Sequence, residues 1–138
     1  MTLVADYSQF AKDFNRYLSL ARRQQKPLSL LLLAIPLTAA STNATLAGRL
    51  AQALRYQVRQ EDLVGCWENR WISIALYGSP RNTTEQRLHH LSSQDDWWQA
   101  GDRTLEVTQT TVGKGLAIFP EDGEDFLTLL HLAQQQCV

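Results

Sequence analysis

The stretch Arg59–Tyr77, RQEDLVGCWENRWISIALY, decides the fold of this chain. It predicts a strand, a tight turn centred on Glu68-Asn69-Arg70, and a second strand. Side chains of the second strand alternate between two faces, as in any pleated strand. One face carries Ile72, Ile74 and Leu76, and the other carries Trp71, Ser73, Ala75 and Tyr77. The centre of the predicted fold is therefore a β-hairpin.

Helical and extended patterns alternate on either side of this hairpin. Asp6 with Gln9 three residues later is a capping-box pattern that begins a helix, and Pro27 ends it. The run 28–35 is apolar apart from Ser29 and shows no period, which predicts a strand covered on both faces. Further helices are predicted along Leu46, Leu50, Leu54 and Val58, over Thr84–Leu91, and along Phe126, Leu129, Leu130 and Ala133. Extended segments are predicted at Leu105–Thr111 and Val112–Phe119.

This order of elements predicts one domain over residues 1–138. The expected fold class is an α/β sandwich with a central mixed, mostly antiparallel sheet of about five strands, flanked by helices. Such a pattern alone leaves the function open.

Composition narrows the class of protein and its partners. The net charge of -1 gives no electrostatic reason to expect nucleic acid or an anionic membrane as a partner. The longest apolar run is too short to span a bilayer, and no signal peptide is evident. Cys66 and Cys137 form neither a disulfide framework nor a metal-ligand spacing. We therefore expect a reduced, cytoplasmic protein with no metal or cofactor and no membrane insertion.

Three segments resemble successive landmarks of the GGDEF domain, the bacterial module that condenses two GTP molecules into cyclic di-GMP. They are ARRQQKPLSLLLLAI (21–35), RQEDLVGCWENRWISIAL (59–76) and TVGKGLAIFPEDGEDFLTLLHLA (111–133). The resemblance extends from about Phe10 to Ala133 and implies the GGDEF fold, with its nucleotide-cyclase-like sheet.

The resemblance also implies which residues stand at the catalytic positions. The family's first strand ends in Asp-x-Asp, whose first carboxylate holds metal, and the matching residues here are Ala34 and Pro36. Neither side chain offers the oxygen that magnesium requires. The family's Gly-Asp pair that reads guanine corresponds to Gly48-Arg49, while Thr42 or Asn43 falls near its Asn in a shortened loop.

The signature itself corresponds to Glu68, Asn69, Arg70, Trp71 and Ile72. Its two glycines and its acidic residues are gone, and only Ile72 keeps the character of its position. Because phosphoryl transfer depends on metals and positioned charges, we expect no cyclase activity. The resemblance therefore implies a degenerate GGDEF domain that is not an enzyme.

One binding motif of the family survives. Its inhibitory Arg-x-x-Asp corresponds to Arg59 and Asp62, at the family's distance from the signature. Arg can bind phosphate or a guanine edge, and Asp can accept from guanine N–H groups. A further arginine from the next helix corresponds to Arg87 or Arg81, with His90 an equal match to that position.

A purely structural interpretation stands beside this one, because Arg59 and Asp62 can pair with each other or cap the preceding helix. Trp71 either fills the vacant nucleotide pocket or offers a surface to a partner, and burial is the more general behaviour of large aromatics. Gly113-Lys114-Gly115 is not a phosphate loop, which needs a longer glycine-framed run.

Two hypotheses follow for a regulatory module of bacterial signalling. In the first, the chain is a cyclic di-GMP receptor that binds through Arg59, Asp62 and Arg87. In the second, it is a nucleotide-independent protein-interaction or dimerisation domain, with the altered hairpin or the Trp97-Trp98 loop as the contact surface. Retained GTP binding without turnover is a third hypothesis, against which Arg49 and the shortened loop argue.

Overall fold

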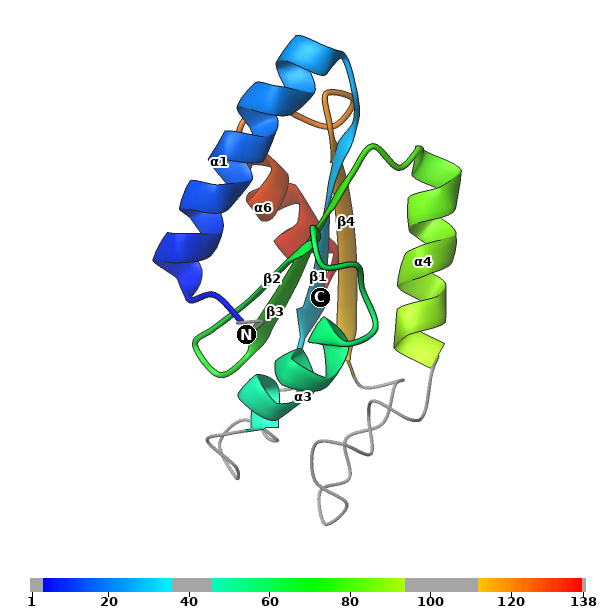
Figure 1. Ribbon diagram of the computed structural model, residues 1–138. Helices are drawn as coiled ribbons and strands as arrows, with labels where there is room; N and C mark the ends of the chain where they lie inside the picture. Colours follow the sequence, from blue (N-terminus) through cyan, green and yellow to red (C-terminus); the bar gives the residue numbers. More distant parts are fainter. Residues whose placement is uncertain (1–3, 36–45, 94–111, 138) are drawn as a thin grey trace.

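A four-stranded antiparallel sheet forms the centre of the structure, a computed structural model that describes residues 4–35, 46–93 and 112–137 (Figure 1). Its strands are β1 (Leu28–Ala34), β2 (Leu63–Trp67), β3 (Trp71–Tyr77) and β4 (Gly113–Phe119), in the order β2-β3-β1-β4. The predicted α/β class is confirmed, with four strands among the described residues where about five were expected. The expected extended segment at 105–111 lies outside those residues.

Helices cover both faces of this sheet in the described part of the chain. They are α1 (Tyr7–Gln24), α3 (Leu46–Arg55), α4 (Arg81–Ser93) and α6 (Phe126–Gln136). Figure 1 shows α1 and α6 on one face and α4 on the other. The core follows this division: α1 and α6 pack in one apolar cluster, and α3 packs in the other. Helix α4 spans 81–93 and is therefore longer at both ends than the helix predicted over Thr84–Leu91.

Strand β1 lies in the middle of the sheet, and all seven of its residues are buried. Leu28, Leu30 and Leu32 belong to the cluster of α1 and α6, whereas Leu31 and Leu33 belong to the cluster of α3. Both faces of the strand therefore need apolar side chains, which explains why the sequence shows no period there.

Helix α1 begins as predicted, with one difference in its cap. The Asp6 carboxylate accepts a hydrogen bond from the Gln9 backbone N–H at 2.8 Å. The Gln9 side chain does not complete the box; its amide donates to Asp13 at 3.0 Å, one turn further on. At the other end Gln25 adopts a left-handed conformation, with φ 54°, and its N–H caps the Ala21 carbonyl.

The hairpin forms as predicted, with Trp67 opposite Trp71. Ala5 lies beside β2 and makes backbone hydrogen bonds to Val64 and Cys66, each 2.9 Å. The two faces of β3 match the predicted alternation, with Ile72, Ile74 and Leu76 in one cluster and Trp71 and Ala75 in the other. No helix in the described ranges has the length and apolarity needed to cross a membrane.

Candidate functional site

A pocket of about 260 Å³ opens between α4, the end of β3 and the segment that joins α3 to β2. It brings together Arg59, Asp62 and Arg87, which the sequence places in two separate stretches. His90 lines the same pocket, whereas Arg81 does not. The rest of the lining consists of Leu76, Ser79, Thr83 and Gln86.

A tight turn carries Arg59 and Asp62. The Asp62 N–H donates to the Arg59 carbonyl at 3.1 Å, and the Asp62 carboxylate accepts from the Arg59 N–H at 2.9 Å. The Arg55 guanidinium, from the end of α3, donates to the carbonyls of both residues. From the opposite side the Tyr17 hydroxyl donates to the Glu61 carbonyl at 2.6 Å. Side chains of two helices, the adjacent α3 and the distant α1, therefore hold the backbone of this turn in place.

The two residues of the motif have different environments. Asp62 is 5% exposed, and burial raises the pKa of its carboxyl. The neighbouring Glu61 raises this pKa further, while the Arg59 N–H and the charges of Arg87 and Arg59 oppose the shift. The Arg59 side chain is exposed and forms no ion pair with Asp62. Asp62 thus has a structural role in closing the turn, and the guanidinium of Arg59 is not used in that role.

Arg87 reaches the pocket from α4. Its Nη2 donates to the Gln57 carbonyl at 3.0 Å, which ties α4 to the chain after α3. A guanidinium has five N–H donors, so this bond leaves others for a ligand. Arg81 points elsewhere, because it pairs with Glu121 and with Asp122, the latter at 2.5 Å. Of the arginines that the sequence offered for this position, the structure places Arg87 at the pocket.

The turn Glu68-Asn69-Arg70 has a backbone shape that glycine commonly adopts, although it contains no glycine. Glu68 and Asn69 have positive φ values of 57° and 47°, as a type I′ turn requires, and the Arg70 N–H donates to the Trp67 carbonyl at 3.2 Å. The Asn69 side-chain oxygen accepts from the Ala47 N–H at 3.3 Å, in the first turn of α3. A helix N-terminus is a common anion-binding site, and here the amide oxygen of Asn69 accepts a hydrogen bond from one of its N–H groups.

Arg70 and Trp71 lie at the end of this turn and contact each other. The Arg70 guanidinium carbon lies 4.5 Å from the centroid of the Trp71 ring. Trp71 is buried and packs into the core cluster of α1 and α6, so its indole fills space. Ile72 is fully buried in the other cluster.

The residues that correspond to the metal ligands of the GGDEF family do not suit a divalent cation. Ala34 lies opposite Trp71 in the sheet and carries no oxygen ligand, and Arg70 carries the same sign of charge as a metal. Within residues 4–35, 46–93 and 112–137, no group of three His, Cys, Asp or Glu side chains is placed to hold a metal. Burial raises the pKa values of Cys66 and Cys137 to about 11, which keeps both thiols protonated.

Gly113 and Gly115 serve packing. A Cβ at Gly115 would lie 2.0 Å from the Ala133 carbonyl oxygen, and one at Gly113 would lie 2.3 Å from that of Cys137. These glycines let β4 approach α6 closely. Pro36, Thr42, Asn43 and the Trp97-Trp98 pair lie outside the described residues.

Sequence reasoning missed Arg55 and the polar rim of Ser79, Thr83 and Gln86. The position of Arg55, four residues before Arg59 at a helix end, was the only local signal for it. Ser79 comes from the loop after β3 and the other two from α4, and nothing in their local pattern distinguishes them.

No protein-family model matches the chain, and no curated protein sequence does. Among solved structures, a DGC protein from Thermotoga maritima is similar, with a TM-score of 0.78 over 99% of this chain and 98% of that one, at 12% identity. The diguanylate cyclase SiaD from Pseudomonas aeruginosa, solved with its activator SiaC, has a TM-score of 0.78 over 99% of this chain and 54% of that one, at 16% identity. The GGDEF domain of DgcB from Caulobacter crescentus, solved with c-di-GMP, has a TM-score of 0.71 over 97% and 81%, at 14% identity. The chain therefore has the GGDEF-domain fold.

Proposed function

We propose that this chain is a non-catalytic GGDEF-like regulatory module of the bacterial cytoplasm that binds cyclic di-GMP. The observation that carries the proposal is the pocket that brings Arg59, Asp62 and Arg87 together. A similar structure, that of DgcB, was solved with c-di-GMP. The fold alone supports many functions, so the side chains of the pocket carry the argument.

The chemistry of the pocket suits a cyclic dinucleotide. Two guanidinium groups, from Arg59 and Arg87, can donate to phosphate oxygens or to the O6 and N7 acceptors of guanine. The Asp62 carboxylate has lost most of its water and accepts one backbone N–H. Guanine N–H donors would replace part of that lost hydration, so a ligand of this kind is favoured over one without donors.

The absence of turnover is the second part of the proposal. Ala34 and Arg70 supply no metal ligand. Asn69 accepts from an N–H at the N-terminus of α3, and Trp71 fills space in the cluster of α1 and α6. Two magnesium-bound triphosphates cannot be held without carboxylates or an equivalent set of oxygens. Synthesis of cyclic di-GMP from GTP by the purified chain would contradict this part.

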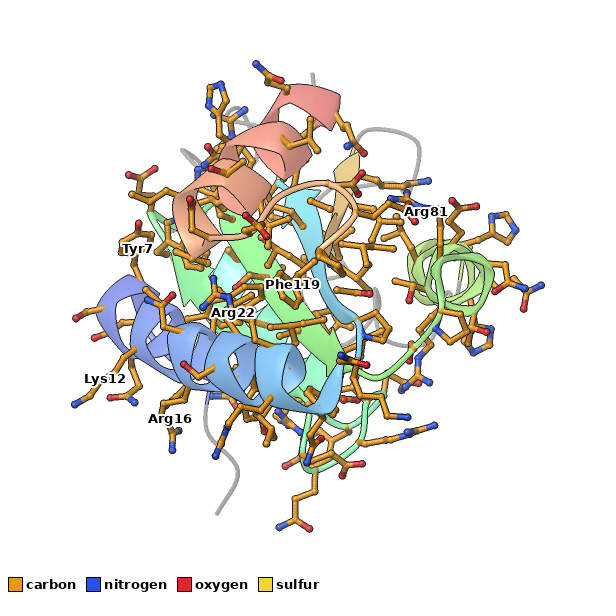
Figure 2. The ribbon with its side chains drawn as sticks, turned by 90° about the horizontal axis from the view of Figure 1, so that it is seen from above. Tyr7, Lys12, Arg16, Arg22, Arg81 and Phe119 are labelled. Atoms are coloured by element: carbon orange, nitrogen blue, oxygen red, sulfur yellow. The ribbon has the colours of Figure 1, made fainter. Side chains whose placement is uncertain are left out.

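Isothermal titration calorimetry with cyclic di-GMP tests the receptor hypothesis. We expect the wild type to bind and Arg59→Ala to bind at least about tenfold more weakly, since a charge-assisted hydrogen bond is lost. The matched control is Arg16→Ala, another arginine with an exposed side chain, on the outer side of α1 (Figure 2), and its affinity should equal that of the wild type.

The outcomes separate the parts of this proposal. If the wild type does not bind, the receptor function is wrong. If Arg59→Ala binds as tightly as the wild type, the ligand lies elsewhere and the site assignment is wrong.

The second candidate is a nucleotide-independent protein-interaction or dimerisation domain. SiaD, which has a similar fold, was solved with a protein activator. In the described part of this chain, Tyr7 and Leu127 are large apolar side chains that remain exposed at the first turns of α1 and α6. A dimer in light scattering that Leu127→Ser dissociates, without cyclic di-GMP binding, would favour this candidate.

A further inference from the structure

A second pocket, of about 350 Å³, lies where the end of α1 meets the start of β1 and the end of β4. Its lining consists of Ala21, Arg22, Gln25, Lys26, Pro27, Phe119 and Pro120. Phe119 and the two prolines provide apolar surface, and Arg22 and Lys26 provide two cations. The volume lies in the range of small-molecule sites, which are mostly apolar with a few polar groups.

Arg22 is held in place at this pocket. Its guanidinium carbon lies 5.5 Å from the centroid of the Phe119 ring, and its Nη2 donates to the Glu124 carbonyl. Figure 2 shows Arg22 and Phe119 next to each other between α1 and the sheet. Most N–H donors of the guanidinium remain after the bond to Glu124.

Lys26 adds a second positive charge. Its ammonium forms no ion pair with another described residue, and no acidic side chain lines the pocket. The end of α1 places Lys26 here, because the N–H groups of Gln25 and Lys26 both donate to the Ala21 carbonyl and turn the chain sharply.

The dipole of α1 opposes an anion at this end of the helix, but its effect is the smaller one. A helix C-terminus carries roughly half a negative charge, screened within one turn. Arg22 and Lys26 bring two full positive charges to the same place. The Asp125 carboxylate interacts electrostatically with Arg22 but does not line the pocket, so the two cations still give the rim a net field that favours a negatively charged group.

We propose that this pocket binds a small aromatic carboxylate. The ring would lie against Phe119 and the prolines, and the carboxylate would accept from Arg22 and Lys26. A carboxylate matches the fork of a guanidinium, whereas a phosphate dianion would lose more hydration against so apolar a lining. The site is separate from the pocket of Arg59 and does not depend on cyclic di-GMP binding.

Naphthalene-2-carboxylate is the probe for this site, titrated into nitrogen-15-labelled protein while amide chemical shifts are recorded. Saturable shifts should concentrate at residues 22–26 and at Phe119. The double variant Arg22→Gln with Lys26→Gln should bind at least about tenfold more weakly. The matched double variant Lys12→Gln with Arg16→Gln removes the same charge from the outer side of the same helix (Figure 2) and should bind like the wild type.

Naphthalene-2-carboxamide, which has the same ring without the charge, should bind at least about tenfold more weakly than the acid. Three results would overturn the proposal. They are an absence of saturable shifts at these residues, equal weakening by the two double variants, and equal binding of the acid and the amide. Both double variants change exposed side chains, so their amide spectra should otherwise match that of the wild type.

Discussion

Arg55 is a buried cation that supports the pocket without lining it. It is 6% exposed, and its guanidinium donates to the carbonyls of Arg59 and Asp62, while its Nε has no partner. The shape of the turn therefore depends on a residue that a ligand would not touch.

Replacing this guanidinium should destabilise the protein. Arg55→Met keeps most of the side-chain volume and leaves the buried Asp62 carbonyl without its donor, which should lower the free energy of unfolding by about 1–3 kcal/mol. Arg59→Ala changes an exposed side chain and should stay within about 0.5 kcal/mol of the wild type. Urea denaturation measures both variants. Equal stability of Arg55→Met and Arg59→Ala would show that the turn does not need Arg55.

Asp62 should make stability depend on pH. Burial raises the pKa of its carboxyl in the folded state, so the folded protein favours the protonated form. The favourable contribution of Asp62 to the free energy of unfolding is complete below the pKa of the unfolded state, about 3.9. It is lost as pH rises through the raised pKa of the folded state. The free energy of unfolding of the wild type, relative to Asp62→Asn, should therefore fall between about pH 4 and the raised pKa. Urea denaturation across this range tests the sign, and a difference that rises with pH would contradict it.

At the scale of elements, the contact between β4 and α6 depends on the absence of a side chain. A Cβ at Gly115 would lie only 2.0 Å from the carbonyl oxygen of Ala133 in α6. Any side chain at this position forces the helix away from the strand, because the obstacle is backbone and cannot rotate aside.

Two glycine-to-alanine variants should consequently have opposite effects. Gly115→Ala should lower the free energy of unfolding by about 1–3 kcal/mol, or more if α6 cannot move. Gly48→Ala, in α3, meets nothing within 4 Å and should raise it by about 0.4–1 kcal/mol, since alanine restricts the unfolded chain and favours helix. Thermal and urea unfolding compare the two variants. Similar effects of both would show that contact at Gly115 is not limiting.

Over the whole molecule, the central strand β1 and helix α4 differ in how firmly they are packed. β1 is buried along its full length. In residues 81–90, the part of α4 whose side chains are described, Thr84 is buried and Leu88 is partly buried, and polar contacts such as Arg87 to Gln57 join the helix to the rest. Ion pairs of Arg81 with Glu121 and Asp122 secure its first turn at a partly exposed site, where such pairs contribute little.

Native-state hydrogen exchange should therefore show α4 opening before the sheet. Residues 81–90 of α4 bury few apolar side chains, which means a low free energy of local opening, so their amides should exchange much faster than those of β1. Saturating cyclic di-GMP should slow exchange in α4 specifically, because the ligand would join Arg87 to Arg59. Equal protection of α4 and β1 would contradict the early opening of α4. Protection of α4 that bound cyclic di-GMP leaves unchanged would contradict the contact of the ligand with Arg87.

Local sequence determined most of the elements of this protein. Alternation in Trp71–Tyr77, the apolar run 28–35 and the Asp6 cap depend on interactions within a few residues, which propensity and period describe well. The hairpin turn was predictable for the same reason. The resemblance in turn selected Arg59 and Asp62 from among the polar residues.

Only the tertiary structure decided which residues meet. Arg87 rather than Arg81 lines the pocket, because Glu121 and Asp122 approach the start of α4 from a distant part of the chain. Packing between elements also brings Arg55 to the turn of Asp62, Asn69 to the N-terminus of α3, and Arg22 to Phe119. A side chain's local pattern sets the face of the element on which it lies, but its partner is set by packing between elements far apart in sequence.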